Sequence, residues 1–142
     1  MLCRVWLSLI ITQCTELLYR TVLYLFPCEL QAILPKRTGQ PRNEEKVAEL
    51  TAILRKSLEV IDTYFLKDKK FIGGEQISIA DLEFLGEITQ YWIAGLDIYK
   101  GRPNIERWME DCQKVLAPHF DKLYQFIYDM RKAGTFATTL DL

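Results

Sequence analysis

The sequence is poor in the side chains that bind metal ions. It has one histidine, His119, and four cysteines, and no two cysteines are spaced as C-x-x-C. A structural zinc site needs about four nitrogen or sulfur ligands, usually supplied as closely spaced pairs. We therefore expect no metal site, and four free thiols packed as small apolar residues in a reducing, cytoplasmic compartment.

An excess of charge and a long apolar run are also lacking. The 142 residues include 18 basic and 19 acidic side chains, for a net charge of −1, which argues against a nucleic-acid partner. Glu16 and Arg20 interrupt the apolar start of the chain before it reaches the about 20 residues of a membrane span. The stretch Val5–Ile11 carries one charge before it and no A-x-A-like site after it, so a buried amphipathic helix is favoured over a signal peptide.

The remaining composition is that of one globular domain. Apolar residues make up 49% and charged residues 26% of the chain. No repeat and no strand-like alternation occurs, so we expect an all-α fold, a helical bundle. The predicted organisation is an apolar helical segment over residues 1–33 that must be covered, a helical domain over residues 34–134, and a frayed tail over residues 135–142.

After a Gly/Pro loop over residues 35–41, an amphipathic helix with a charged face is predicted. Asn43 is the expected N-cap, with Glu44 and Glu45 in the first turn. Apolar residues then recur in steps of three and four at Val47, Leu50, Leu54, Leu58, Ile61 and Phe65, with Ile53, Val60 and Tyr64 widening the stripe. The charged residues expected on the opposite, solvent-facing side are Glu49, Arg55, Lys56, Glu59 and Asp62.

A capping box is predicted at the start of the next helix. Ser78 stands at the N-cap and Asp81 at the third helical position, and Ile77 and Leu82 can form a hydrophobic staple around them. The residues that follow are apolar nearly all round the helix, which is typical of the central helix of a bundle.

Two further helices are expected to begin at prolines. Pro103 opens one with Ile105, Trp108, Met109 and Cys112 on a single face. Pro118 opens the other, whose inward side chains are predicted to be Phe120, Leu123, Tyr124, Ile127 and Met130, and Gly134 ends it.

No catalytic group is predicted from the residues themselves. His119 has no evident partner, and the chain has neither a P-loop nor a G-x-G-x-x-G motif. The carboxylate pairs at residues 44–45 and 110–111 are adjacent on helices, so their side chains point about 100° apart and do not converge on a substrate.

The capping region resembles a known family. Phe71-Ile72-Gly73-Gly74-Glu75-Gln76-Ile77-Ser78-Ile79-Ala80-Asp81-Leu82 is similar to the N-capping region of the glutathione S-transferase C-terminal domain. Leu34-Pro35, Gly39-Gln40-Pro41, Tyr64–Lys69, Glu87-Ile88-x-Gln90, Gly95, Tyr99–Pro103 and Trp108 resemble the theta class, so the likeness covers about residues 34–132. The resemblance implies the helical bundle of that domain.

The same resemblance implies a role in binding electrophiles. It places Glu29, Ile33 and Gln90 in the wall of the electrophile pocket, with Tyr91 where some theta enzymes have the second residue of a His-Pro pair. In the complete family a thioredoxin-like domain binds the co-substrate glutathione and carries the catalytic serine. Residues 1–34 do not resemble that domain, so we expect this chain to contribute the electrophile pocket and the dimer contact and to bind no cofactor itself.

The expected partners are a small hydrophobic electrophile and either a second copy or a related transferase-like subunit, bound through the first two helices. The alternative is a non-catalytic protein-interaction module, because similar domains assemble complexes in translation elongation factor gamma subunits and aminoacyl-tRNA synthetases.

Overall fold

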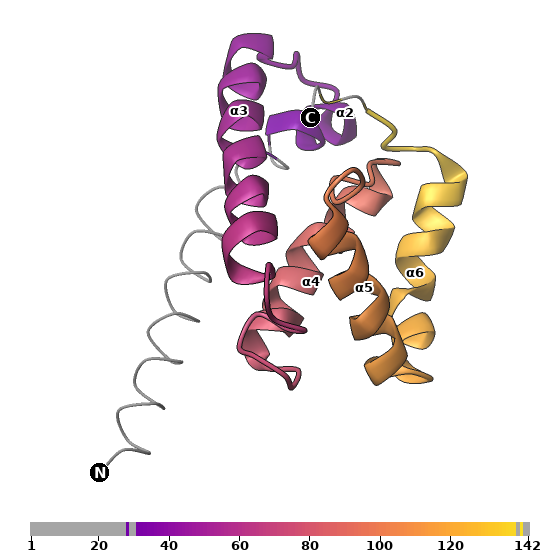
Figure 1. Ribbon diagram of the computed structural model, residues 1–142. Coiled ribbons are helices and arrows are strands. Elements are labelled where there is room, and N and C mark those ends of the chain that lie inside the picture. The colour runs from indigo at the N-terminus through magenta and orange to yellow at the C-terminus, as the bar shows by residue number, and fades with distance from the viewer. Residues whose placement is uncertain (1–27, 29–30, 139, 141–142) are drawn as a thin grey trace.

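The computed structural model describes residue 28, residues 31–138 and residue 140 (Figure 1). Over these residues the elements in chain order are α2 (Leu34–Thr38), α3 (Glu44–Val60), the π-helical turn η1 (Ile61–Phe65), α4 (Ile79–Ile93), α5 (Pro103–Leu116) and α6 (His119–Ala133). The only bridge between extended residues in this part of the chain is a single pair, Phe71 with Gly74. The predicted all-α fold is confirmed; the expectations for residues 1–27 lie outside the described residues.

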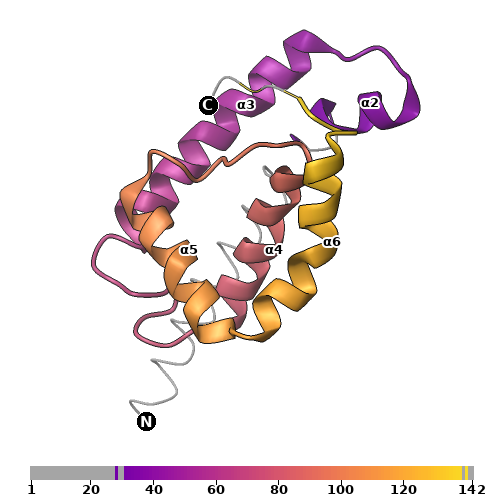
Figure 2. The same cartoon turned by 90° about the vertical axis from the view of Figure 1, so that its right-hand side faces the viewer.

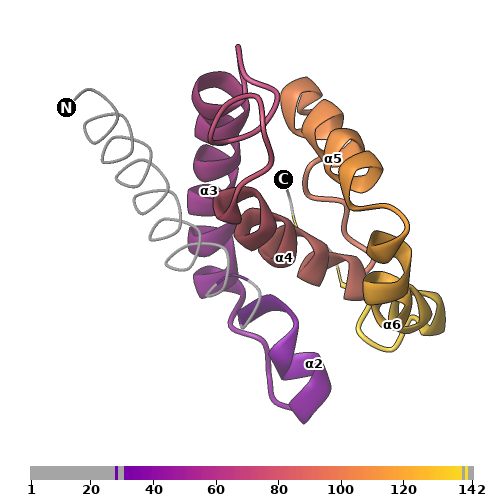
Figure 3. The same cartoon turned by 90° about the horizontal axis from the view of Figure 1, so that it is seen from below.

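Helix α4 occupies the middle of the bundle. Figure 2 shows it between α5 and α6, and Figure 3 shows α3 on its remaining side. Phe84, Leu85, Ile88 and Tyr91 are at most 1% exposed, which confirms the prediction of a central, buried helix. The first turn is the exception, because Ile79 and Leu82 are largely exposed.

The apolar stripe of α3 is buried as predicted, and Asn43 caps the helix by accepting from Lys46 N at 3.0 Å. The prediction fails where α3 continues into η1. Val60 and Tyr64 are exposed rather than part of the stripe, and Asp62 is buried rather than solvent-facing. Asp62 follows Leu58 by four residues, so helical geometry places it only about 40° from that buried side chain, whereas Val60 lies about 160° away. From Ile61 the chain continues as a π turn, closed by Leu66 N donating to Ile61 O.

Asp62 acts as the cap of a helix distant in sequence. Its Oδ1 accepts from Asn104 N at 2.9 Å and from Ile105 N at 3.0 Å, and its backbone carbonyl accepts from Asn104 Nδ2. These bonds satisfy free N–H groups in the first turn of α5. A carboxylate is also favoured there by the helix dipole, so Asp62 fixes α5 against the end of α3.

The loop predicted over residues 35–41 is partly helical. Leu34–Thr38 form the short helix α2, with Pro35 in its first turn, where the missing N–H costs nothing. Gly39 ends it with φ of 71°, a left-handed conformation suited to glycine. The proline and glycine that predicted a loop therefore mark the start and the end of a short helix.

The capping box at α4 is confirmed and is part of a larger network. Asp81 Oδ2 accepts from Ser78 N at 2.8 Å and from Ser78 Oγ at 2.7 Å. Asp81 Oδ1 accepts from Ile72 N and from Trp108 Nε1, both at 2.8 Å. One fully buried carboxylate thus joins the 71–74 turn, the start of α4 and the middle of α5.

Helices α5 and α6 begin near the predicted prolines, and the predicted face of α5 is buried. On α6 the prediction for Leu123 is wrong, because it is 74% exposed, and Met130 is only half-buried and is not packed against the core cluster. The helix packs instead through aromatic residues around Trp92 of α4: Tyr128 stacks on the Trp92 ring at 5.8 Å, and Phe120 and Tyr124 meet its edge. Tyr128, which the sequence did not predict to face inward, is thus part of the packing, whereas Leu123 is not.

The end of the described chain contacts the bundle. Thr138 N donates to Ala94 O at 3.2 Å. Leu140 packs against the main core around α4 and against a smaller buried cluster of Ala32, Ile33, Val47 and Ala94. The structure at these two residues differs from the frayed tail that the sequence predicts.

Candidate functional site

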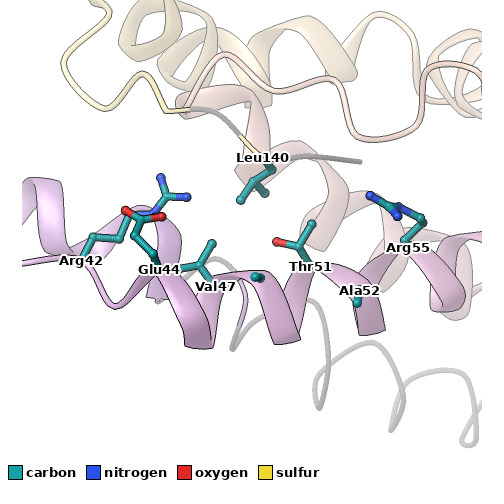
Figure 4. Close-up of a pocket in the computed structure, with 8 residues that line it drawn as sticks. Arg42, Glu44, Val47, Thr51, Ala52, Arg55 and Leu140 are labelled. Carbon is teal, nitrogen blue, oxygen red and sulfur yellow. The ribbon is translucent and has the colours of Figure 1, made fainter.

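A hollow of about 310 Å³ lies between α3 and the C-terminal segment, and we call it the α3 hollow (Figure 4). Its lining residues are Arg42, Glu44, Val47, Ala48, Thr51, Ala52, Arg55 and Leu140. Figure 4 shows Arg42 and Glu44 at one end and Arg55 at the other, with Leu140 facing α3 across the space. The hollow therefore combines an apolar middle with charged ends.

The Arg42 side chain holds the C-terminal segment beside α3. Its Nη1 donates to Thr138 Oγ1 at 2.9 Å, and its Nε lies 3.2 Å from Glu44 Oε2. The bond to Thr138 joins residues 96 positions apart in the chain. Together with the bond from Thr138 N to Ala94 O, it holds the segment whose Leu140 lines the hollow.

The apolar middle is continuous with a small cluster beneath it. Ile33, Val47 and Ala94 are buried together with Ala32, and Leu140 packs against them. The Val47 side chain thus lines the hollow and also packs within this buried cluster. An apolar group placed in the hollow would lose water-exposed surface against this cluster, which is favourable.

A buried polar group lies behind the hollow. Cys28 Sγ lies 3.8 Å from the Thr51 hydroxyl oxygen, and Thr51 is also a lining residue. Burial raises the pKa of the Cys28 thiol, although hydrogen bonds with Thr51 and Tyr91 and the charge of Arg42 oppose the rise. The thiol is therefore protonated near neutral pH and is not poised as a nucleophile.

The other described cysteine is also inert. Cys112 is fully buried on α5, and burial together with the charges of Asp81 and Asp111 raises the pKa of its thiol far above the ordinary range. Cys28 and Cys112 are both free, as predicted; Cys3 and Cys14 lie outside the described residues.

Three of the four residues that the resemblance assigns to the pocket wall, Ile33, Gln90 and Tyr91, are not among the residues that line the α3 hollow. Glu29 lies outside the described residues. Ile33 is 8% exposed and Tyr91 is fully buried, while Gln90 is partly buried. Ile33 and Tyr91 lie directly behind the hollow, through Val47 and through Cys28 and Thr51. Their contact with a substrate stays a prediction.

The residues that line the hollow were not predicted as a site. Arg42 and Leu140 are brought together only by the return of the chain after α6, and no local pattern signals that contact. Thr51 carries a weak signal, because it is a polar residue next to Leu50 on the buried side of α3.

A second hollow of about 390 Å³ adjoins the same helix and shares Arg55. Its other lining residues are Glu59, Asp62, Thr63, Lys100, Gly101 and Arg102. Burial lowers the pKa of Arg102, and the charges of Asp62 and Glu59 oppose that effect. Since charges of both signs line this space, it selects neither an anion nor a cation.

Metal ligands do not cluster in the described part of the chain: no three of its His, Cys, Asp or Glu side chains are grouped to hold an ion. Among the described helices, none is both long and apolar enough to cross a membrane.

Comparison with known proteins agrees with the fold. The sequence pattern of the family described as "Glutathione S-transferase, C-terminal domain" matches residues 25–114. The chain is 33% identical over 105 residues to glutathione S-transferase T3 of Arabidopsis thaliana, which covers 70% of this chain and 18% of that protein. It is 32% identical over 104 residues to glutathione S-transferase theta-1 of Gallus gallus, which covers 72% of this chain and 40% of that protein.

A solved structure of a mutant of human glutathione S-transferase T1-1, in its apo form, has the same fold. The TM-score is 0.69 at 24% identity, over 89% of this chain and 54% of that one. The chain spans less than half the length of these curated relatives, and it matches their C-terminal portion. By the match over residues 25–114, this chain belongs to the glutathione S-transferase family, as its C-terminal domain.

Proposed function

We propose that this chain supplies the electrophile-binding and subunit-contacting half of a theta-like glutathione transferase. In the reaction implied by the family, the glutathione thiolate attacks an electrophilic carbon and displaces a leaving group. The observation that carries the proposal is the α3 hollow, which lies against the predicted pocket residues Ile33 and Tyr91. Glutathione enters as a co-substrate bound elsewhere in the complete enzyme.

The character of the hollow suits a small hydrophobic electrophile. Val47, Ala48, Ala52 and Leu140 offer apolar surface, and a few polar groups at the margins can orient a ligand, as is typical of small-molecule sites. The Arg55 guanidinium at one end provides positive charge near a departing anion. The chain's own contribution is therefore binding and orientation of the electrophile.

The site can be tested with a fluorescent amphipathic anion, 8-anilinonaphthalene-1-sulfonate. Ala52 is an exposed residue of α3 that lines the hollow, so Ala52→Trp should fill it. We expect dye affinity to fall about tenfold, which corresponds to about 1.4 kcal/mol. Lys56→Trp is the matched control, because Lys56 is exposed on the same helix and does not line the hollow. Equal dye affinity in wild type and Ala52→Trp would place the binding site elsewhere.

The reaction itself can be tested in a chimera that joins this chain to the glutathione-binding half of the chicken theta-1 relative. With an aryl halide as electrophile, Ala52→Trp should raise KM for the electrophile about tenfold and leave KM for glutathione unchanged. A folded chimera that binds glutathione but forms no conjugate contradicts the electrophile-binding role.

The alternative function is a non-catalytic interaction module. One observation favours it: Leu123 and Phe126 expose 74% and 67% of their side chains on one helix, as interaction surfaces do. Under either function we propose a cytoplasmic protein that forms a homodimer, or pairs with a related subunit, through the segment 1–34 and α3. Replacement of Leu18 or Leu25 by aspartate should then weaken that dimer.

A further inference from the structure

An apolar strip runs along the outer side of α6. Figures 1 and 2 show α6 at the edge of the bundle, with one side turned away from α4 and α5. Leu123 and Phe126 are 74% and 67% exposed, and Met130 is half-buried beside them. At about 100° per residue these three side chains fall within a sector of about 60°. None of them belongs to the α3 hollow or to the segment 1–34.

The spacing of this strip is that of a helix–helix seam. His119, Leu123, Phe126, Met130 and Ala133 follow one another in steps of four, three, four and three residues. These steps are the a and d positions of a heptad pattern, which pack into a partner helix. The side chains of α6 that bury against the domain, Phe120 and Tyr124, lie on another sector of the helix. The helix is therefore apolar on two sides, and only one of them is covered by this domain.

The charges beside the strip indicate what covers it. Lys122 and Asp129 are exposed, stand seven residues apart and occupy the g positions that flank the seam on one side. When two such helices pack antiparallel, the g positions of one helix lie beside the g positions of the other. A second copy laid antiparallel, with Leu123 against the partner's Phe126, brings Lys122 of each copy to Asp129 of the other. The ion pair between Lys122 and Asp129 then forms twice, as a two-fold interface requires.

We propose that the outer face of α6, defined by Leu123, Phe126, Met130, Lys122 and Asp129, is a self-complementary surface on which two copies of this chain associate through antiparallel α6 helices. The contact is one helix wide, so it forms a weak, concentration-dependent association. It is separate from the dimer contact proposed for the segment 1–34 and α3, and in a protein that also uses that contact it joins dimers into larger assemblies.

Charge reversal tests the proposal, with the mean molar mass from light scattering over a concentration series as the readout. Lys122→Glu leaves two negative charges on the flank and Asp129→Lys leaves two positive charges. Each single variant should associate about tenfold more weakly than wild type, since both copies of the pair become repulsive. The double variant Lys122→Glu/Asp129→Lys should regain the wild-type association.

The most discriminating light-scattering experiment mixes the two single variants, Lys122→Glu and Asp129→Lys. One carries only negative and the other only positive flank charges, so the mixture should reach a higher mean mass than either variant alone. Lys67→Glu, in the exposed turn after η1, is the control and should behave as wild type, and circular dichroism checks that every variant is folded. A wild-type mass that does not change with concentration overturns the proposal. The proposal is also overturned if all the α6 variants associate as strongly as wild type.

Discussion

Trp108 Nε1 donates to Asp81 Oδ1 at 2.8 Å, between residues 27 positions apart in the chain. The same oxygen accepts from Ile72 N, and the other oxygen of the carboxylate is occupied by Ser78. Trp108 and Asp81 are fully buried, so each of these donors would be stranded without its acceptor. A residue predicted as half of a helix cap is thus also the point at which α5 is fixed to α4.

Replacing Asp81 should therefore cost more than a cap alone. A lost cap costs about 1 kcal/mol, and each buried donor left unsatisfied costs about 1–3 kcal/mol. We expect Asp81→Ala to lower the free energy of unfolding by about 3–5 kcal/mol, measured by urea denaturation followed through tryptophan fluorescence. Asp121→Ala, in the exposed first turn of α6, is the control and should cost less than about 1 kcal/mol. A loss no larger than the control's would mean that the network does not contribute to stability.

The stability that Asp62 of η1 contributes by capping α5 should be measurable by the same unfolding experiments. Asp62→Ala removes the acceptor of Asn104 N and Ile105 N, and we expect a loss of about 1–2 kcal/mol in thermal or urea unfolding. Glu59→Ala, one turn earlier and exposed, should change stability by less than about 0.5 kcal/mol. Equal effects of the two substitutions would contradict a capping role for Asp62.

The ion pair between Asp97 and Arg131 predicts a pH dependence. Arg131 Nη1 and Nη2 donate to the two carboxylate oxygens at 2.6 and 2.9 Å, and these bonds hold the pKa of Asp97 below its usual value. An aspartate with a lowered pKa in the folded state stabilises the fold above its unfolded pKa, about 3.9, and loses that contribution as the pH falls through the folded value.

Asp97→Asn should accordingly destabilise the protein at pH 7 by about 1 kcal/mol and make stability fall less steeply below about pH 4. Urea denaturation at several pH values measures both effects. Asp68→Asn, in the exposed turn after η1, is the control. A pH profile of Asp97→Asn that runs parallel to wild type at acid pH would refute the assignment.

The buried thiols should be protected from modification. In a variant with Cys3 and Cys14 replaced by serine, we expect Cys28 and Cys112 to react with Ellman's reagent at least about a hundredfold more slowly than a thiol introduced on the surface by Glu75→Cys. Urea should release both thiols to full reactivity. Rapid modification of either cysteine in the folded protein would contradict its burial.

Local patterns were sufficient for much of the fold. The steps of three and four along α3 predicted its buried stripe, and the order Ser78, Asp81 predicted where α4 begins, because both depend on neighbours within a turn of helix. Pro103 marked the start of α5 for the same reason. The resemblance carried by the 71–82 run predicted the family that the comparison then showed.

The errors and omissions arose where distant segments meet. Asp62 was predicted to be a surface charge, but it caps α5. Leu123 was predicted to be a core residue, but it is exposed, and Tyr128 stacks on Trp92 instead. The α3 hollow was not predicted, because Arg42 meets Thr138 only after the chain has passed through α3, η1, α4, α5 and α6.

The sequence by itself therefore determined the helices, their caps and the family, since these depend on periodicity and on groups a few residues apart. Only the tertiary structure decided which polar groups are buried as partners, where the hollow lies and which side of α6 stays open. These features depend on contacts between residues as distant in the chain as Arg42 and Thr138, which are 96 positions apart, and no periodic pattern encodes such contacts.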